Sequence, residues 1–241
     1  MTKFPRQLNA LQVAEILGPD CVNATADQVA RAASRFFSKK GGFSYDPTRR
    51  RDVGVISRHT SLERALAEIA SSGQPLGRPW NAELLKAIHN QFERRSYRCR
   101  PFKLTFRPIV DGLVLRIPCK FFIVENGEVI FNVMQLSRSE KSRLSLSQAR
   151  FVLSATSHTL VRGDMASASV ALCDLSKSKK KGDRDPVWHD SHEIGILGRD
   201  DLNRVLTIYM QGYAKAIEGG LLPASAYRPA RGWEEDQYRL L

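Results

Sequence analysis

The sequence has few cysteines and no long hydrophobic run. Its four cysteines lie far apart and form no C-x-x-C pair. This spacing excludes a dense disulfide framework or a cysteine-based zinc motif, and it favours reduced, mostly buried thiols. No stretch approaches the roughly 20 uncharged apolar residues of a membrane span, and no apolar signal-peptide core follows the first residues. We therefore predict a cytoplasmic protein with no membrane partner.

The sequence also lacks the short motifs of several enzyme classes. It contains no G-x-S-x-G nucleophile elbow, no G-x-x-x-x-G-K-[ST] phosphate loop and no G-x-G-x-x-G dinucleotide turn. Cys99 lies between Arg98 and Arg100, and nearby positive charge lowers the pKa of a thiol. A single cysteine in a basic segment is a weak sign of catalysis, so we predict no nucleophilic catalytic residue.

Acidic residues are scarce relative to basic ones. The chain has 25 Asp and Glu against 37 Lys and Arg, which gives a formal net charge of +12. Such a surplus favours contact with nucleic acid or another polyanion, although it locates no binding site. Hydrophobic residues make up 42% of the 241 residues, a proportion typical of a folded protein that needs no metal to stabilise its core.

The hydrophobic pattern changes along the chain. Helical spacing of apolar residues recurs over residues 1–100, strand-like alternation begins near residue 101, and helical spacing returns after residues 145 and 201. Residues 45–52 are polar and basic, which predicts an exposed loop, and Asn81 is expected to cap the helix that follows it. We predict an α+β fold, a largely antiparallel β-meander with helices packed on it. Its parts are a helical region (1–100), an α+β core (101–220) and an irregular tail (221–241), joined in one compact domain.

The clearest local signal is Asn126-Gly127 between two apolar runs. Both residues tolerate positive φ, which predicts a hairpin with a type I′ turn that pairs Glu125 with Glu128. Because side chains alternate along a strand, Lys120 is expected on the opposite face from the following set. One face is expected to carry Cys119, Phe121, Ile123, Ile130, Asn132 and Met134, with Phe121 opposite Asn132 and Cys119 opposite Met134.

A β-meander, a helix and a further strand over residues 109–175 resemble the core of the PD-(D/E)XK nucleases. In that family an Asp on one strand and an Asp/Glu-x-Lys on the next hold Mg²⁺, and the lysine positions or activates the attacking water. The resemblance implies that Asn132-Val133-Met134 stands at the Asp/Glu-x-Lys position and Gln148 at a glutamine found in some branches. Methionine cannot replace the lysine, so a nuclease-like core would lack its usual site. A buried hairpin in an unrelated mixed sheet is the simpler interpretation.

Two sets of residues are weaker candidates for metal chemistry. A metal-dependent phosphodiesterase would use Asp111, Glu128 or Asn132 in an unorthodox arrangement with Mg²⁺ or Mn²⁺. His189 and His192, beside Glu193, have ligand types that suit Zn²⁺. Proline and glycine around these histidines favour a loop, so we expect them to be structural or solvent-facing and predict no metal site or cofactor.

Basic residues interleaved with aromatic ones give the strongest functional signal. Arginine forks bind phosphates, and exposed aromatic rings stack on unpaired bases. The expected phosphate contacts are Arg94, Arg95, Arg98, Arg100, Lys103 and Arg107. We expect a non-catalytic nucleic-acid-binding protein. Two alternatives stay open, an atypical metal-dependent nuclease and an accessory protein that binds an acidic protein partner.

Overall fold

A five-stranded mixed sheet forms the centre of the computed structural model, which describes residues 3–5, 7–38, 45–71, 75–103, 105–109, 114–136, 143–177, 184–223 and 226–229. The strand order is β2-β5-β6-β7-β8. β6 and β7 run parallel and the other neighbours antiparallel. The strands are β2 (Arg98–Pro101), β5 (Cys119–Glu125), β6 (Glu128–Gln135), β7 (Ser169–Asp174) and β8 (Val187–Asp190). This largely antiparallel sheet confirms the predicted α+β class.

Two small antiparallel sheets accompany the central one. β3 (Thr105–Pro108) pairs with β4 (Val114–Ile117), and β1 (Lys3–Pro5) pairs with β9 (Tyr227–Pro229). β9 falls in the tail that the sequence predicts to be irregular, and it joins the two ends of the described chain. Residues 230–241 lie outside the described residues.

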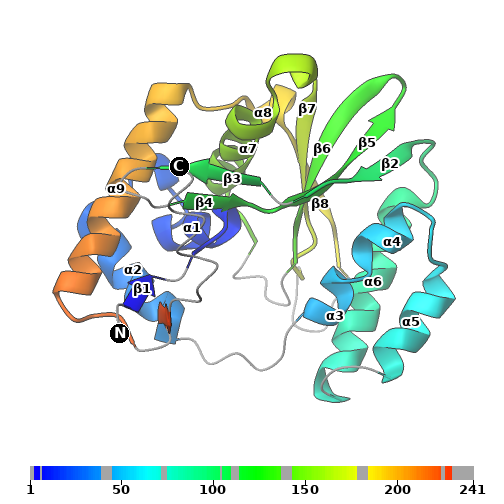
Figure 1. Ribbon diagram of the computed structural model, residues 1–241, viewed down its shortest axis with the longest axis horizontal. Helices are drawn as coiled ribbons and strands as arrows, with labels where there is room; N and C mark the ends of the chain where they lie inside the picture. Colours follow the sequence, from blue (N-terminus) through cyan, green and yellow to red (C-terminus); the bar gives the residue numbers. More distant parts are fainter. Residues whose placement is uncertain are drawn as a thin grey trace.

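Helices lie on both sides of the sheet (Figure 1). One group contains α1 (Ala10–Leu17), α2 (Ala26–Ser38), α7 (Leu146–Leu160) and α9 (Arg199–Glu218). The other contains α3 (Asp46–Arg49), α4 (Asp52–Ile56), α5 (Leu62–Ser71) and α6 (Arg78–Phe92). The short α8 (Ser191–Ile194) follows β8 directly. The helices of the first hundred residues are thus divided between the two faces of the sheet.

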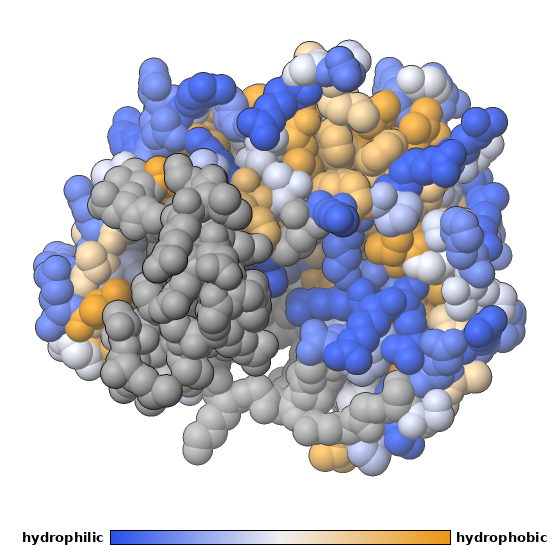
Figure 2. All heavy atoms as spheres, in the orientation of Figure 1, coloured by the Kyte–Doolittle hydropathy of each residue, from blue (hydrophilic) through white to orange (hydrophobic). Residues whose placement is uncertain are grey.

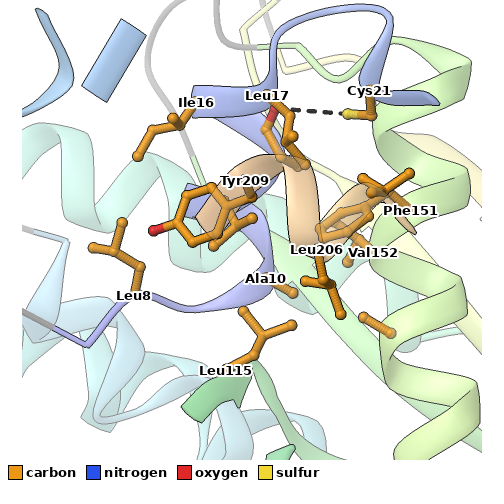
Figure 3. Packing of buried hydrophobic residues seen from close by; sticks show 14 of the residues in the cluster. Leu8, Ala10, Ile16, Leu17, Cys21, Leu115, Phe151, Val152, Leu206 and Tyr209 are labelled. Atoms are coloured by element: carbon orange, nitrogen blue, oxygen red, sulfur yellow. Dashed lines mark hydrogen bonds between the residues drawn. The ribbon is translucent and has the colours of Figure 1, made fainter. Parts of the chain in front are cut away.

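Each face of the sheet buries its own hydrophobic cluster. The larger cluster joins one face of the sheet to α1, α2, α7 and α9. In Figure 3, Leu206 and Tyr209 of α9 lie among residues of α1 and α7, including Ala10 and Phe151. The second cluster packs the other face against α4 and α6, with Phe92 at its centre. Because both faces are covered, β7 is buried along its whole length.

The chain starts α7 with the capping box expected at Ser145. The Ser145 hydroxyl accepts from the Gln148 backbone N–H at 3.1 Å, and the Gln148 side chain accepts from the Ser145 N–H at 2.9 Å. Ser145 also donates to the Pro19 carbonyl at 2.5 Å, which ties α7 to the turn after α1. One short side chain therefore satisfies a helix end and a contact distant in sequence.

Substituting Ser145 by alanine is expected to lower the free energy of unfolding by about 1–2 kcal/mol, because it removes the cap and the bond to Pro19. Urea denaturation would measure this loss. Thr25→Ala is the matched control, since Thr25 caps α2 through a longer, exposed bond of 3.4 Å to the Gln28 N–H. A loss for Thr25→Ala as large as that for Ser145→Ala would contradict the role given to the Pro19 contact.

The hairpin prediction is confirmed at its turn and corrected at its far end. Asn126 and Gly127 have φ of 52° and 84°, and Glu125 faces Glu128 as expected. Cys119, however, pairs with Val133 instead of Met134, because the register shifts between Cys119 and Phe121. In such a bulge, two residues of one strand lie opposite a single residue of its partner. The side chains before the bulge therefore point to the other side of the sheet.

The bulge moves two side chains to unexpected faces. Cys119 belongs to the hydrophobic cluster on the α7 side, and not to the face of Phe121. Lys120 instead shares a pocket with Asn132, although the sequence predicted opposite faces. This difference decides the chemistry of the site described below.

Within residues 45–52, where the sequence predicted an exposed loop, Asp46–Arg49 form α3 and Asp52 begins α4. Pro47 lies in the first turn of α3, where its fixed φ suits a helix start. Thr48 is fully buried, and its hydroxyl donates to Asn81 Oδ1 at 2.7 Å. Asn81 is therefore an interior residue of α6, which begins at Arg78, and the prediction that it caps this helix was wrong.

Candidate functional site

A pocket of about 260 Å³ opens at the end of the sheet where β5 begins and β6 ends. Residues from both helix groups and from β4 line it together with the sheet. Its charged lining residues are Asp46, Arg49, Asp52, Arg116 and Lys120. The pocket therefore brings opposite charges together with the two strands on which a nuclease-like core would carry its site.

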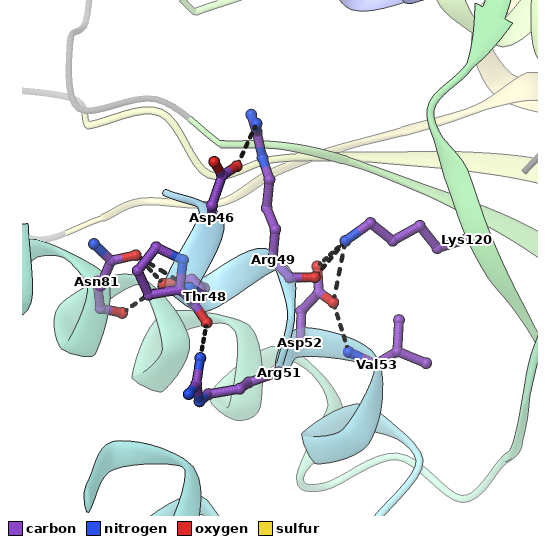
Figure 4. Close-up of polar contacts among 9 residues, drawn as sticks. Asp46, Thr48, Arg49, Arg51, Asp52, Val53, Asn81 and Lys120 are labelled. Carbon is purple, nitrogen blue, oxygen red and sulfur yellow. Dashed lines mark hydrogen bonds and ion pairs between the residues drawn. The ribbon is translucent and has the colours of Figure 1, made fainter. Parts of the chain in front are cut away.

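An ion pair between Asp52 and Lys120 crosses from α4 to β5 (Figure 4). Lys120 Nζ lies 3.1 Å from Asp52 Oδ2, and the two side chains are 39% and 4% exposed, respectively. Lys120 also donates to the Arg49 carbonyl at 2.5 Å, and the Val53 N–H donates to Asp52 Oδ1 at 2.7 Å. Burial raises the pKa of the Asp52 carboxyl, and the nearby Lys120 charge opposes that rise.

Asn132 lines this pocket and carries an unsatisfied side-chain oxygen. Only 1% of the residue is exposed, and its Nδ2 donates to the Ile130 carbonyl at 2.8 Å. Its Oδ1 is buried and accepts no hydrogen bond from the described residues. Leaving a buried acceptor unpaired costs about 1–3 kcal/mol. The sequence names Asn132 as a weaker candidate, and the structure adds that its side-chain acceptor is unpaired.

The charges at the pocket rim are more exposed. Arg49 Nη1 lies 3.8 Å from Asp46 Oδ1, with side chains 50% and 59% exposed. Arg116 of β4 also lines the pocket. Sequence reasoning missed Asp46 and Asp52 because it treated residues 45–52 as a loop. The signal that was present is Asp46-Pro47, an acid and a proline of the kind that open a helix.

Of the residues expected for nuclease chemistry, the two that the structure describes, Glu128 and Asn132, do not meet. Glu128 lies exposed beside the hairpin turn, four residues or roughly 13 Å along β6 from Asn132. Asp111 lies outside the described residues. Gln148 does not reach the pocket either, because its side chain caps α7 and donates to the Ala14 carbonyl at 2.9 Å.

The histidine segment is regular where the sequence predicted a loop. His189 lies on β8 opposite Leu172, whereas His192 and Glu193 belong to α8 and are exposed. Burial lowers the pKa of His189. Across the described residues, no three His, Cys, Asp or Glu side chains form a group suited to a metal ion.

The expected basic cluster is divided among several places. α6 ends at Phe92, so Arg94 and Arg98 do not share a helical face. Arg98 and Arg100 lie exposed on β2, which is an edge strand, and Lys103 follows them, also exposed. Arg94 is exposed between α6 and β2. These three cations, Arg98 and Arg100 on β2 and Lys103 just after it, are called the edge row below.

Arg95 is engaged within the fold. Its guanidinium binds both carboxylate oxygens of Glu125, with Nε 3.0 Å from Oε1. It also lies over the rings of Phe92 and Trp188, 5.5 and 5.4 Å from their centroids. The hydrogen bonds from Arg95 hold the pKa of Glu125 below its usual value. Arg95 thus fixes the start of β2 against the hairpin.

Arg107 belongs to a different surface. It lies on β3, and its Nη2 donates to Asn203 Oδ1 of α9 at 2.8 Å. Burial and the charge of Arg199 lower the pKa of Arg107. Phe106 is 38% exposed, whereas Arg107 is half-buried, so β3 turns its arginine and not its phenylalanine toward the protein.

Cys99 points away from its two arginine neighbours. It packs in the cluster that contains Phe92, and burial raises its pKa to about 11. The expectation of positive charge lowering this pKa was wrong, because alternation along β2 places the arginines on the opposite face. Burial likewise raises the pKa of Cys21 and Cys119 to about 12.

The edge row borders an aromatic surface. Arg98 pairs with Val124 and Arg100 with Phe122, so these side chains share one face of the sheet. Phe102 lies 6.4 Å from Phe122 between ring centroids, and both rings are partly exposed. In Figure 2, hydrophobic residues gather over the strands and hydrophilic residues border them. Cations and aromatic rings therefore lie together at this edge.

Comparison with known proteins gives no family assignment. No protein-family model, curated protein or solved structure matches the chain. Within the described ranges, no helix has the length and apolar character required to cross a membrane. Function must be inferred from the chain's own side chains.

Proposed function

We propose that the protein binds nucleic acid without cleaving it, and that the edge row contacts the phosphates. One observation carries the proposal. Arg98, Arg100 and Lys103 follow one another along an exposed sheet edge, and none of them has an ion-pair partner among the described residues. Unpaired cations on an edge can displace the counterions of a phosphate backbone.

The aromatic surface beside the edge row favours a single strand. Guanidinium groups bind phosphates through paired hydrogen bonds. Partly exposed rings such as Phe102 and Phe122 offer π-faces on which unpaired bases stack, an interaction worth about 1–3 kcal/mol per base. Neither contact depends strongly on the identity of the base, so we expect similar affinity for nucleic acids of unrelated sequence.

A degenerate nuclease-like core is the framework that we propose for this binding surface. The hairpin β5–β6, the helix α7 and the parallel strand β7 follow in the order that suggested the resemblance. On that resemblance, Asn132 and Met134 would take the positions where the family carries an acid and a lysine. In the pocket, Lys120 neutralises Asp52, an arrangement better suited to holding a strand than to binding Mg²⁺ or Mn²⁺.

Fluorescence anisotropy with labelled single- and double-stranded DNA and RNA, titrated across salt in EDTA, tests the proposal. Substituting Arg98, Arg100 and Lys103 together by alanine is expected to weaken single-strand binding at least about tenfold at low salt. The slope of log affinity against log salt should fall by about 2, since each lost phosphate contact removes about 0.7.

The matched control removes the same charge from another surface. Arg31 and Arg35 lie exposed on α2, and Arg162 lies exposed after α7. Substituting these three by alanine should leave the salt slope almost unchanged. An equal loss in both triple variants would show that net charge alone drives binding. Absence of wild-type binding at low salt would exclude the proposal and favour an acidic protein partner. Mn²⁺-dependent cleavage abolished by Asp52→Asn would make the protein a nuclease.

A further inference from the structure

We propose that the pocket between α3, α4 and the ends of β5 and β6 binds a single nucleotide, with its base inside and its phosphate at the rim. The idea that this nucleotide belongs to a bound strand rests on the proposed function. The affinity of the pocket for a free nucleoside monophosphate follows from the pocket itself and is tested separately.

Asn132, a residue of the pocket lining, offers an unpaired hydrogen-bond acceptor. The orientation of the Asn132 amide is set by its Nδ2, which donates to the Ile130 carbonyl, so its Oδ1 is the atom left unpaired. Ring N–H and exocyclic amino groups of nucleobases are donors of this kind. A bound base would satisfy an acceptor that otherwise remains buried without a partner.

Apolar walls flank this acceptor. Phe121, Met134 and Leu136 line the pocket from the sheet side, and Leu11 lines it from α1. Planar bases pack well against such surfaces because their faces are poorly hydrated. The volume of about 260 Å³ lies below the roughly 300–1,000 Å³ typical of drug-sized ligand pockets. One nucleotide, and not a dinucleotide cofactor, matches this size.

The rim supplies cations for a phosphate. Arg49 is half exposed, and its ion pair with the exposed Asp46 is long at 3.8 Å, so a phosphate displaces it with little loss of energy. Arg116 adds positive charge at the same opening. The charge of Asp52 is already balanced by Lys120 and does not repel the phosphate strongly.

The register of the sheet connects the edge row to this pocket. Pro101 pairs with Phe121, and the Phe102 N–H donates to the Lys120 carbonyl at 2.9 Å. β2 therefore runs from the hairpin end, where Arg98 lies, toward the pocket end, where Lys103 follows. A strand bound along the edge would arrive at the pocket with its terminal nucleotide.

Isothermal titration calorimetry of the full chain with the four common ribonucleoside and deoxyribonucleoside 5′-monophosphates tests the site. Nucleosides, which lack the phosphate, probe the base site, and ribose 5-phosphate, which lacks the base, probes the phosphate site at the rim. We expect at least one monophosphate to bind, and both half-ligands to bind at least tenfold more weakly. Failure of every monophosphate to bind at millimolar concentration would overturn the proposal.

Asn132→Leu separates ligand binding from folding. It removes the unpaired acceptor and keeps the number and branching of the side-chain heavy atoms, so the stability of the protein should change little, whereas monophosphate affinity should fall at least tenfold. Met134→Leu is the matched control, because it changes the pocket wall and leaves the acceptor in place. Arg49→Gln should weaken the binding of monophosphates and leave the binding of nucleosides unchanged. Unchanged monophosphate binding by Asn132→Leu would exclude the assigned base contact.

The two proposals can fail independently. The triple alanine variant of the edge row should lose affinity for the polymer and keep that for monophosphates. Asn132→Leu should show the opposite pattern, with polymer affinity reduced only slightly. Monophosphate binding without polymer binding would support the nucleotide pocket and exclude the proposal that the protein binds a nucleic-acid strand. Polymer binding without monophosphate binding would support the edge row as the nucleic-acid contact and exclude the nucleotide pocket.

Discussion

Gly212→Ala is expected to destabilise the protein by about 2 kcal/mol, although alanine favours a helix by about 1 kcal/mol over glycine. Gly212 lies in α9 where this helix crosses α2. A Cβ at this position would lie 2.5 Å from Val29 Cβ and 2.6 Å from the Ala26 carbonyl oxygen. The second contact is with backbone, so α2 as a whole must move. Forced overpacking of this kind costs about 1–3 kcal/mol or more.

Urea and thermal denaturation would measure the effect of Gly212→Ala. The expected loss lowers the melting temperature by about 4–8 °C for a chain of this size. Gln211→Ala is the control on the same helix, since Gln211 is exposed and its substitution should change stability by less than about 0.5 kcal/mol. A more stable Gly212→Ala variant would show that α2 and α9 lie further apart than described.

The elements predictable from the sequence are those with a local cause. Asn126-Gly127 forces the hairpin turn because both residues adopt positive φ at little energetic cost. Ser145 and Gln148 start α7 through bonds that span three residues. In each case the signal and the structure it predicts lie within one turn of chain.

The elements that the sequence did not predict depend on distant partners. α3 and α4 contain four and five residues, too few to be stable alone. Their polar residues are buried because Thr48 meets Asn81 and Asp52 meets Lys120, partners 33 and 68 residues away. The short stretches of sequence from which helices and strands are predicted do not contain both members of such a pair.

The same limit applies to the candidate sites. Sequence proximity grouped Arg95 with Arg98 and Arg100, but Glu125 of the hairpin holds Arg95 in the fold. The β-bulge before Phe121 reversed the expected face of Lys120. Asn132 could be selected from the sequence because the turn fixes its register, whereas the charges around it could not.

Lys120→Met is expected to lower the free energy of unfolding by about 2–3 kcal/mol at neutral pH. Removing one partner of a fully buried ion pair costs about 3–5 kcal/mol. The expected loss is smaller because the Lys120 side chain is 39% exposed and water partly replaces it. The remaining Asp52 carboxylate, 4% exposed, would keep only the weaker effect of the Arg49 charge.

The pH dependence of this loss distinguishes charge from packing. Burial already raises the pKa of folded Asp52 above its unfolded value, and loss of Lys120 raises it further. Between the unfolded and the folded pKa of Asp52, the folded state holds more protons than the unfolded state. The free energy of unfolding therefore falls as pH rises through this range. The penalty of Lys120→Met relative to wild type should therefore be largest at neutral pH and shrink as pH falls toward the unfolded pKa.

Urea denaturation of both proteins over this pH range would measure the difference, and combining Lys120→Met with Asp52→Asn should abolish its pH dependence. Lys103→Met is the control for an exposed lysine just after the neighbouring strand β2. A penalty independent of pH would mean that Lys120 stabilises the protein through its hydrogen bond to the Arg49 carbonyl and its packing. Because Lys120 holds α3 and α4 against the sheet, loss of its charge should also open the pocket whose rim they form.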